Sequence, residues 1–417
     1  MVIRFKKKDI PKYIIMLELF FTCFIYFFID VVRLPSVFKY TCDILNLILL
    51  MYILGKLKSI RNRTSKNVIY ILLLVGIFIL LSFVFWIPNY SNVLLLLWGA
   101  RNTFRFLIFF VACILFLDKL FIKKILAKVD LLIIINFLLC LFEFVVMNLS
   151  GDNIGGGFGT SSGCNAPLNA LLIIVTTFNA SKYLNKEKSI FEAILYIGLC
   201  AIIAGMAELK VFVFEVILVI SLVSLFSKGL IKKIAIVVIA IIFSLASIKL
   251  IEMLIPGWDG FFTVENMYKM VSSTKGYTNS GDLNRVTSIS TLNKMFFSNN
   301  INWIGFGLGN CEYSDSFSVL NSSFFKSYGY LHYGWFSIAK IYLELGWFGI
   351  ISYISIWGYT LICALKSLKK EYFYKTFIAT ISIMSIFLFF YNNTMNLDGA
   401  YLIYLCLSIT YIFNKGN

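Results

Sequence analysis

Residues 68–87 read VIYILLLVGIFILLSFVFWI, twenty positions without a charged residue or a proline. A helix of this length rises about 30 Å, which is the thickness of the hydrocarbon core of a bilayer. The stretch also lacks the alternation of apolar and polar side chains that is typical of membrane barrel strands. Because lipid offers no hydrogen-bond partner to an exposed backbone, the stretch predicts a transmembrane α-helix.

Similar apolar stretches recur along the whole chain of 417 residues. The composition is 60% hydrophobic and 14% charged, whereas a soluble domain is about 45–50% apolar. No internal repeat is visible, so we expect a single all-α membrane domain over 1–417 with about twelve transmembrane helices. The expected spans lie near 12–29, 37–54, 68–87, 93–117, 125–148, 167–181, 190–208, 211–227, 231–251, 336–361, 374–391 and 400–413.

The loops between these spans differ in charge, and every second one is basic. Lysine and arginine in short loops are retained on the cytoplasmic side. This pattern, rather than nucleic-acid binding, explains the net charge of +16, and it predicts a multi-pass membrane protein with both termini on the cytoplasmic side. The basic residues of the expected cytoplasmic loops are Lys56, Lys58, Arg61, Arg63, Lys66, Lys119, Lys123, Lys124, Lys128, Lys182, Lys186, Lys188, Lys228, Lys232, Lys233, Lys366, Lys369, Lys370 and Lys375.

The segment 252–335 is expected to be one long external loop. Loops of this length inside a domain are usually functional or disordered. Aromatic residues such as Trp303 and Trp335 persist through it, which favours an ordered structure. Within the loop, 282–297 predicts a short amphipathic helix capped near Asp282 or Ser280.

Ionisable side chains inside a span are costly, so those that occur need an explanation. Arg101 and Arg105 lie four positions apart and share one helical face in the outer half of their span. Two guanidinium groups facing a cavity suit a phosphate or pyrophosphate. The alternatives are that both reach toward water or that they pair with a carboxylate such as Glu143.

Two further sites carry isolated cations. Lys210 lies at an external turn, where it is either a ligand for an anion or an interfacial anchor. Lys340 and Glu344 are four positions apart at the outer end of a span, which favours a mutual ion pair.

His332 is the only histidine of the chain, and it lies just before an expected span at the outer surface. An imidazole can accept a proton near neutral pH without special tuning. A lone histidine is also often a polar surface residue. Its aromatic neighbours Tyr330, Tyr333 and Trp335 favour a shaped pocket and hence a catalytic role.

Several chemical signatures are missing from the sequence. It contains no Walker A loop, and no cluster of histidine, cysteine or acidic residues has the spacing of a metal site. The run GGGFG at 155–159 is not a dinucleotide fingerprint, and we expect a tight loop or room for a sugar against the backbone. Cys164 and Cys311 are the only cysteines in expected external loops, and the simpler interpretation is two free thiols rather than a disulfide.

Four features occur in order late in the chain: Arg285, WIGFGLG at 303–309, His332, and YLELGWFG at 342–349. Together with the layout of spans and one long external loop, they resemble the O-antigen polymerase and O-antigen ligase superfamily, the Wzy and WaaL proteins. The resemblance in layout covers nearly the whole chain, and the motif resemblance covers 285–349. It implies a GT-C-like helical membrane fold whose long loop contains short helices.

The resemblance also implies roles for individual residues. His332 corresponds to the histidine proposed as general base, and Arg285 to a loop arginine that contacts the lipid pyrophosphate. Arg101, Arg105 and Lys210 would bind the same pyrophosphate. The sequence departs from the family at Lys210, where many members have arginine, and after the histidine, where tyrosine replaces the frequent asparagine.

The function implied is metal-independent and cofactor-independent glycosyl transfer on the outer face of the bacterial cytoplasmic (inner) membrane. The donor and the acceptor would both be glycans on undecaprenyl pyrophosphate, and the product would be an O-antigen or capsular polysaccharide. A flippase and a chain-length regulator are further expected partners. Two alternatives stay open: an O-antigen ligase that delivers the glycan to lipid A core, and a flippase or other transporter without enzymatic activity.

Overall fold

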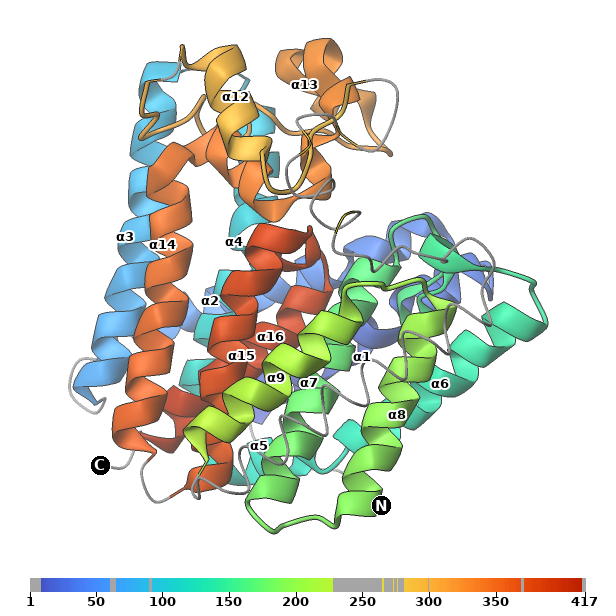
Figure 1. Ribbon diagram of the computed structural model, residues 1–417. Helices are drawn as coiled ribbons and strands as arrows, with labels where there is room; N and C mark the ends of the chain where they lie inside the picture. The colour runs from blue at the N-terminus through green and yellow to red at the C-terminus, as the bar shows by residue number, and fades with distance from the viewer. Residues whose placement is uncertain are drawn as a thin grey trace.

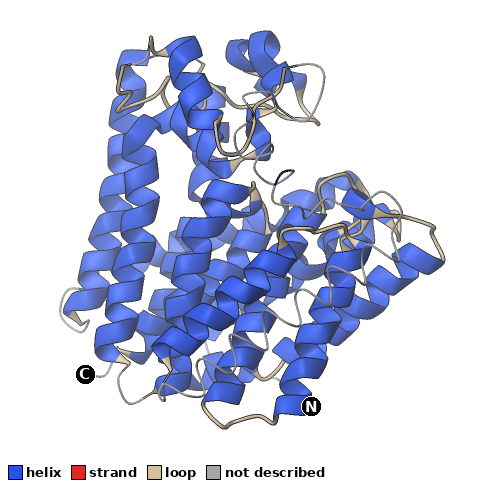
Figure 2. Ribbon diagram, in the orientation of Figure 1, coloured by secondary structure: helices blue, strands red, loops and turns tan. Residues whose placement is uncertain are grey.

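The computed structural model describes residues 9–60, 65–89, 92–227, 265, 273, 276, 281–298, 300–368 and 371–414. Within these ranges all regular secondary structure is helical (Figure 2). Seven helical segments are long and apolar enough to cross a bilayer, and three further apolar helices are shorter. The chain is therefore a helical polytopic membrane protein, as the sequence predicts.

Eleven expected spans coincide with helices, and the one at 231–251 lies outside the described residues. The count of twelve crossings stays a prediction. The long helices are α1 (Ile10–Asp30), α2 (Thr41–Ile60), α3 (Lys66–Trp86), α4 (Val93–Phe116), α6 (Val129–Val145), α7 (Asn165–Leu184), α8 (Ile190–Met206), α9 (Phe212–Phe226), α14 (Ser337–Ser367), α15 (Tyr372–Tyr391) and α16 (Gly399–Phe413). The short elements are α5 (Lys119–Leu126), α12 (Ser288–Phe296), α13 (Ser323–Tyr328) and the 3-10 turns η2 (Ser36–Tyr40), η3 (Ile87–Asn89), η4 (Gly151–Asn153), η5 (Gly156–Phe158), η6 (Ser318–Leu320), η7 (Gly329–Leu331), η8 (Tyr333–Trp335) and η9 (Thr394–Asn396).

The core of the bundle forms around α16, in which every residue is buried. This helix packs against α4, α7 and α15. The outer helices α2 and α3 instead turn large apolar residues outward, such as Leu47 at 63%, Met51 at 71% and Leu80 at 61% exposure. Apolar surface in water costs about 25 cal/mol per Å², so these faces suit lipid acyl chains.

Helix α14, which runs beside α3 (Figure 1), is interrupted at Gly346, where φ is 59° and ψ is −153°. A loop segment fills the break. The Trp347 N–H donates to the Asn302 carbonyl at 3.0 Å, and the Phe306 N–H donates to the Leu343 carbonyl at 2.7 Å. Backbone groups freed inside a membrane protein need such partners. The expected tenth span is therefore not one continuous helix.

The two ends of the bundle differ in character. At one end, Lys12 of α1 pairs with Asp118 at 2.5 Å, and the Lys119 ammonium lies 5.3 Å from the ring centroid of Phe413 in α16. The hydrogen bond from Lys12 lowers the pKa of Asp118. The expected cytoplasmic lysines within the described ranges gather at this end, and α12 and α13 lie at the opposite end (Figure 1). Which side of the membrane each end faces stays a prediction.

The long loop contains short helices, but the one expected at 282–297 is shorter. Helix α12 begins at Ser288, after Thr287 as its N-cap. Ahead of it the Asn284 side chain accepts a hydrogen bond from the Val286 N–H at 3.1 Å, a local turn that competes with helix formation. Asp282 is buried and does not cap the helix.

Candidate functional site

Arg285 and His332 lie close together although 46 residues separate them in sequence. The Leu283 N–H donates to the Leu331 carbonyl at 3.0 Å, so the backbones that carry the two side chains run beside each other. Arg285 lies over two rings, 4.4 Å from the centroid of Tyr391 and 6.0 Å from that of Phe336. The loop arginine is thereby held above the end of α15.

The backbone of His332 is left-handed, with φ of 49° and ψ of 35°. This conformation is uncommon for a residue other than glycine and is enriched at functional sites. The imidazole stacks on the indole of Trp335, with ring centroids 4.1 Å apart and planes within 10°. Its Nδ1 is buried and has no hydrogen-bond partner among the described residues. Burial of Nδ1 leaves Nε2 as the ring nitrogen available to a ligand.

Arg101 is held by the carboxylate of Asp43, which lies in the second helix, α2. Its Nε and one terminal nitrogen donate to the two oxygens of Asp43 at 2.9 and 2.5 Å, and its other terminal nitrogen donates to Asn102 at 2.5 Å. All three guanidinium nitrogens are therefore engaged within the protein. The expected alternative of pairing with a carboxylate applies to Arg101, but the partner is Asp43 rather than Glu143.

Arg105 is more buried, at 8% exposure, and is less completely satisfied. It pairs with Asp398 at 2.9 Å and donates to the Asn396 carbonyl at 3.4 Å. Its Nε and the Asn396 amide nitrogen are both buried and lack a hydrogen-bond partner within the described part of the chain. Buried donors are nearly always satisfied by protein, water or a ligand. These two donors therefore remain available for an acceptor.

The connection between α15 and α16 joins the two groups of residues. Arg285 lies against Tyr391 at its start, and Arg105 contacts Asn396 within it. The Ser337 N–H, at the start of α14, donates to the Asn392 carbonyl of the same connection at 2.9 Å. The candidate site is therefore built around 391–398, a role that no motif in the sequence indicates.

Lys210 lies in the turn between α8 and α9, where its N–H donates to the Glu208 carbonyl at 2.8 Å. This turn is at the same end of the bundle, because Asn165 at the start of α7 donates to the Ala207 carbonyl at 3.2 Å. Either of its expected roles fits this position, so anion binding by Lys210 stays a prediction.

The expected ion pair between Lys340 and Glu344 is wrong. The Lys340 ammonium lies 2.7 Å from a carboxylate oxygen of Glu312 in the long loop, and Asn102 donates to the other oxygen at 2.8 Å. Glu344 instead accepts from the Cys311 N–H at 3.2 Å. The carboxylate of Glu312, from the loop, therefore takes the place beside Lys340 that the sequence predicts for Glu344.

The loop around Glu312 is tightly packed. Tyr333, which follows the histidine, is buried and donates its hydroxyl to the Cys311 carbonyl at 2.7 Å. Burial raises the pKa of the Tyr333 and Tyr313 hydroxyls and of the Cys311 thiol. These groups stay protonated at neutral pH and act as structural contacts.

The run GGGFG at 155–159 has no room for a sugar against its backbone. Gly155 and Gly156 donate their N–H groups to Glu143 at 3.1 and 2.7 Å. A side chain at Gly157 would begin 2.0 Å from the Cys23 carbonyl oxygen of α1. The expected tight loop is correct, and protein fills its inner face.

Both loop cysteines are free and buried, so the simpler interpretation of two thiols holds. The Cys164 thiol lies 3.3 Å from the Asp152 carbonyl oxygen, and burial raises its pKa. No group of histidine, cysteine or acidic side chains among the described residues could hold a metal ion.

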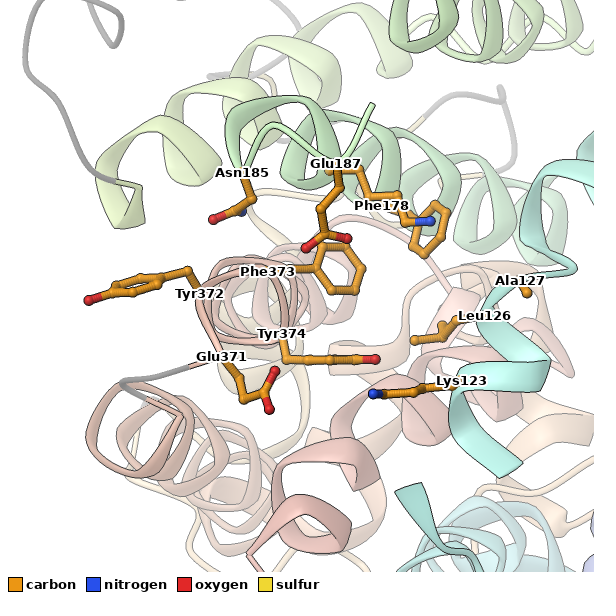
Figure 3. Close-up of a pocket in the computed structure, with 11 residues that line it drawn as sticks. Lys123, Leu126, Ala127, Phe178, Asn185, Glu187, Glu371, Tyr372, Phe373 and Tyr374 are labelled. Carbon is orange, nitrogen blue, oxygen red and sulfur yellow. The ribbon is translucent and has the colours of Figure 1, made fainter. Parts of the chain in front are cut away.

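A cavity of about 520 Å³ lies at the other, lysine-rich end (Figure 3). Lys123 of α5, Lys182 of α7, and Glu187 and Glu371 of two connecting segments supply its charged lining. The Lys182 ammonium lies 4.5 Å from the ring centroid of Phe178. The cavity is separate from the candidate site, since α5 and the start of α15 lie at the end opposite α12 and α13.

Comparison with protein-family models and with curated protein sequences gives no match to this chain. The assignment of function therefore rests on the residues and their geometry.

Proposed function

We propose that the protein polymerises lipid-linked oligosaccharide repeat units by glycosyl transfer on the outer face of the cytoplasmic membrane. The observation that carries the proposal is that Arg285 and His332 stand on neighbouring backbone segments, and that the connection at 391–398 contacts both Arg285 and the buried Arg105. A base and an anion site next to each other are what displacement of a sugar from a pyrophosphate needs. The bundle supplies a membrane setting for a substrate with a polyprenyl tail.

His332 is the proposed general base. Nε2 would accept the proton of an acceptor sugar hydroxyl as its oxygen forms a bond to the anomeric carbon of the donor. The bond between that carbon and the pyrophosphate oxygen breaks, and the pyrophosphate leaves with the electron pair. Atoms and charges balance without ATP, because the donor linkage already stores the energy. Stacking on Trp335 supports this role by fixing the plane of the imidazole.

The leaving pyrophosphate needs cations and donors that are in place before the reaction. Arg285 and Arg105 fit this role, since both contact the connection at 391–398. The Asn396 amide is an added candidate that the sequence did not suggest. Arg101 instead supports the site without binding the pyrophosphate directly, because Asp43 and Asn102 already accept hydrogen bonds from its guanidinium nitrogens.

Reconstitution of the purified protein with its lipid-linked repeat unit tests the proposal, with products separated on a gel. We expect a ladder of polymers for wild type and its loss in His332→Gln. Lys294→Gln is the matched control, because this lysine of the same loop is exposed and has no part in the proposed mechanism. A ladder from His332→Gln would refute the general base. A single product on a lipid A core acceptor would identify a ligase instead, and transbilayer movement without a product would identify a flippase.

Arg285→Lys and Arg285→Ala separate charge from geometry. Lysine keeps the charge but not the planar fork that binds two phosphate oxygens. We expect activity in the order wild type, Arg285→Lys, Arg285→Ala. Equal activity of all three would remove Arg285 from the pyrophosphate site.

A further inference from the structure

Trp335 combines two properties that the general-base role of His332 does not require together. Its indole lies parallel to the imidazole of His332 at 4.1 Å, and 41% of the residue is nevertheless exposed. The turn η8 fixes this arrangement, because the Trp335 N–H donates to the His332 carbonyl at 2.9 Å. A partly exposed indole is thereby held in place beside the proposed base.

We infer that Trp335 is a stacking platform for a pyranose ring of the acceptor glycan. The inference rests on the proposed function and names a subsite within it. The C–H groups on one face of a pyranose carry partial positive charge, and the face of an indole is negative. The contact buries apolar sugar surface without using hydroxyl groups, so it tolerates different sugars at this position.

The geometry also says which sugar binds there. The smaller imidazole ring covers one face of the indole, so the pyranose occupies the exposed remainder. A sugar stacked on the indole is therefore not the one whose hydroxyl reaches Nε2 of His332. The stacked ring is a neighbour of the reacting sugar in the acceptor chain, and it holds that sugar in register with the base.

An interfacial anchor is the competing explanation, because tryptophan and tyrosine are enriched where membrane meets water. An anchor would need exposure but no parallel contact with a histidine. Trp303 offers the comparison within this loop: it is 56% exposed, and no ring stacking of it with a histidine is found in the described structure. Comparison of variants at the two tryptophans therefore distinguishes sugar stacking from a general effect of lipid contact.

The test measures binding of the delipidated repeat-unit oligosaccharide to the purified full chain by saturation-transfer NMR titration. We expect Trp335→Ala to weaken binding by about tenfold, which is the upper part of the range for one aromatic contact. Trp335→Phe keeps a π face and should stay within about threefold of wild type, whereas Trp335→Leu keeps apolar bulk alone and should resemble Trp335→Ala. Trp303→Ala is the matched control and should bind as wild type does.

Two outcomes would overturn the platform: wild-type binding by Trp335→Ala and Trp335→Leu, or an equal loss in Trp303→Ala. The binding measurement and the polymerisation assay can fail independently, so the sugar platform and the proposed function are tested separately. If wild type binds the oligosaccharide through Trp335 but forms no ladder, polymerisation is wrong and the sugar site stands. If wild type forms a ladder and Trp335→Leu has an unchanged affinity, the platform is wrong and polymerisation stands.

Discussion

Replacement of Gly309 by alanine should separate the long loop from α4. Gly309 has φ of +85°, and a side chain there would begin 2.2 Å from the Leu95 carbonyl oxygen. Gly99 of α4 faces the same contact, since its own side chain would begin 2.5 Å from the Gly309 Cα. Backbone lies directly on backbone, so neither side can yield by a change of rotamer.

The structure supplies a control for the cost of the backbone alone. Gly163 has φ of +87°, and a side chain there would meet nothing within 4 Å. Holding alanine in a left-handed conformation costs about 1–2 kcal/mol at either position. Overpacking adds about 1–3 kcal/mol at Gly309 only. We therefore expect Gly309→Ala to be the less stable variant by roughly that second amount.

Thermal unfolding of both variants in the same detergent measures the difference, and gel analysis of the polymer measures its consequence. The Asn102 amide nitrogen lies 2.8 Å from Glu312, three residues beyond Gly309, so displacement of the loop should also weaken this contact. We expect a lower midpoint and lost polymerisation for Gly309→Ala, with near wild-type activity for Gly163→Ala. Equal midpoints would refute the direct packing of the loop on α4.

Two further perturbations test other parts of the structure. Arg105→Ala leaves the buried Asp398 unpaired, which costs about 3–5 kcal/mol. The double variant Arg105→Ala/Asp398→Ala should regain much of the thermal midpoint but should not polymerise. Restored polymerisation in the double variant would remove Arg105 from the site. Val319→Cys, in the loop, should react with a membrane-impermeant maleimide in intact cells, whereas Lys124→Cys should react only after permeabilisation. The reverse pattern would show that the predicted orientation in the membrane is wrong. Background is low at neutral pH, because burial raises the pKa of the Cys311 thiol and only the thiolate reacts.

The positions of the helices could be predicted because each follows from a local property. The stretch at 68–87 needs only its own length and lack of charge to specify α3 (Lys66–Trp86). The sequence also predicts which end of the bundle carries the long loop and which end carries the lysines, because both depend only on the order of residues along the chain. Such properties do not depend on which segments later meet in space.

The partners of the charged residues could not be predicted in this way. Lys340 and Glu344 satisfy the rule for neighbouring residues on a helix, yet Glu312 from the loop takes the lysine. That rule describes isolated helices, and a buried cation accepts whichever carboxylate the tertiary fold brings to it. Asp43 did carry a usable signal, since an acidic residue inside an expected span is a functional candidate by default.

The choice between carboxylate pairing and ligand binding for Arg105 is not exclusive. A guanidinium has five N–H donors, and Asp398 and the Asn396 carbonyl engage only the terminal nitrogens. Pairing offsets the cost of holding the charge inside the bundle before a substrate arrives. The unused Nε can then meet a phosphate oxygen without release of Asp398. The Nε of Arg101, unlike that of Arg105, already donates to Asp43, so we propose a supporting role for Arg101 and anion binding for Arg105.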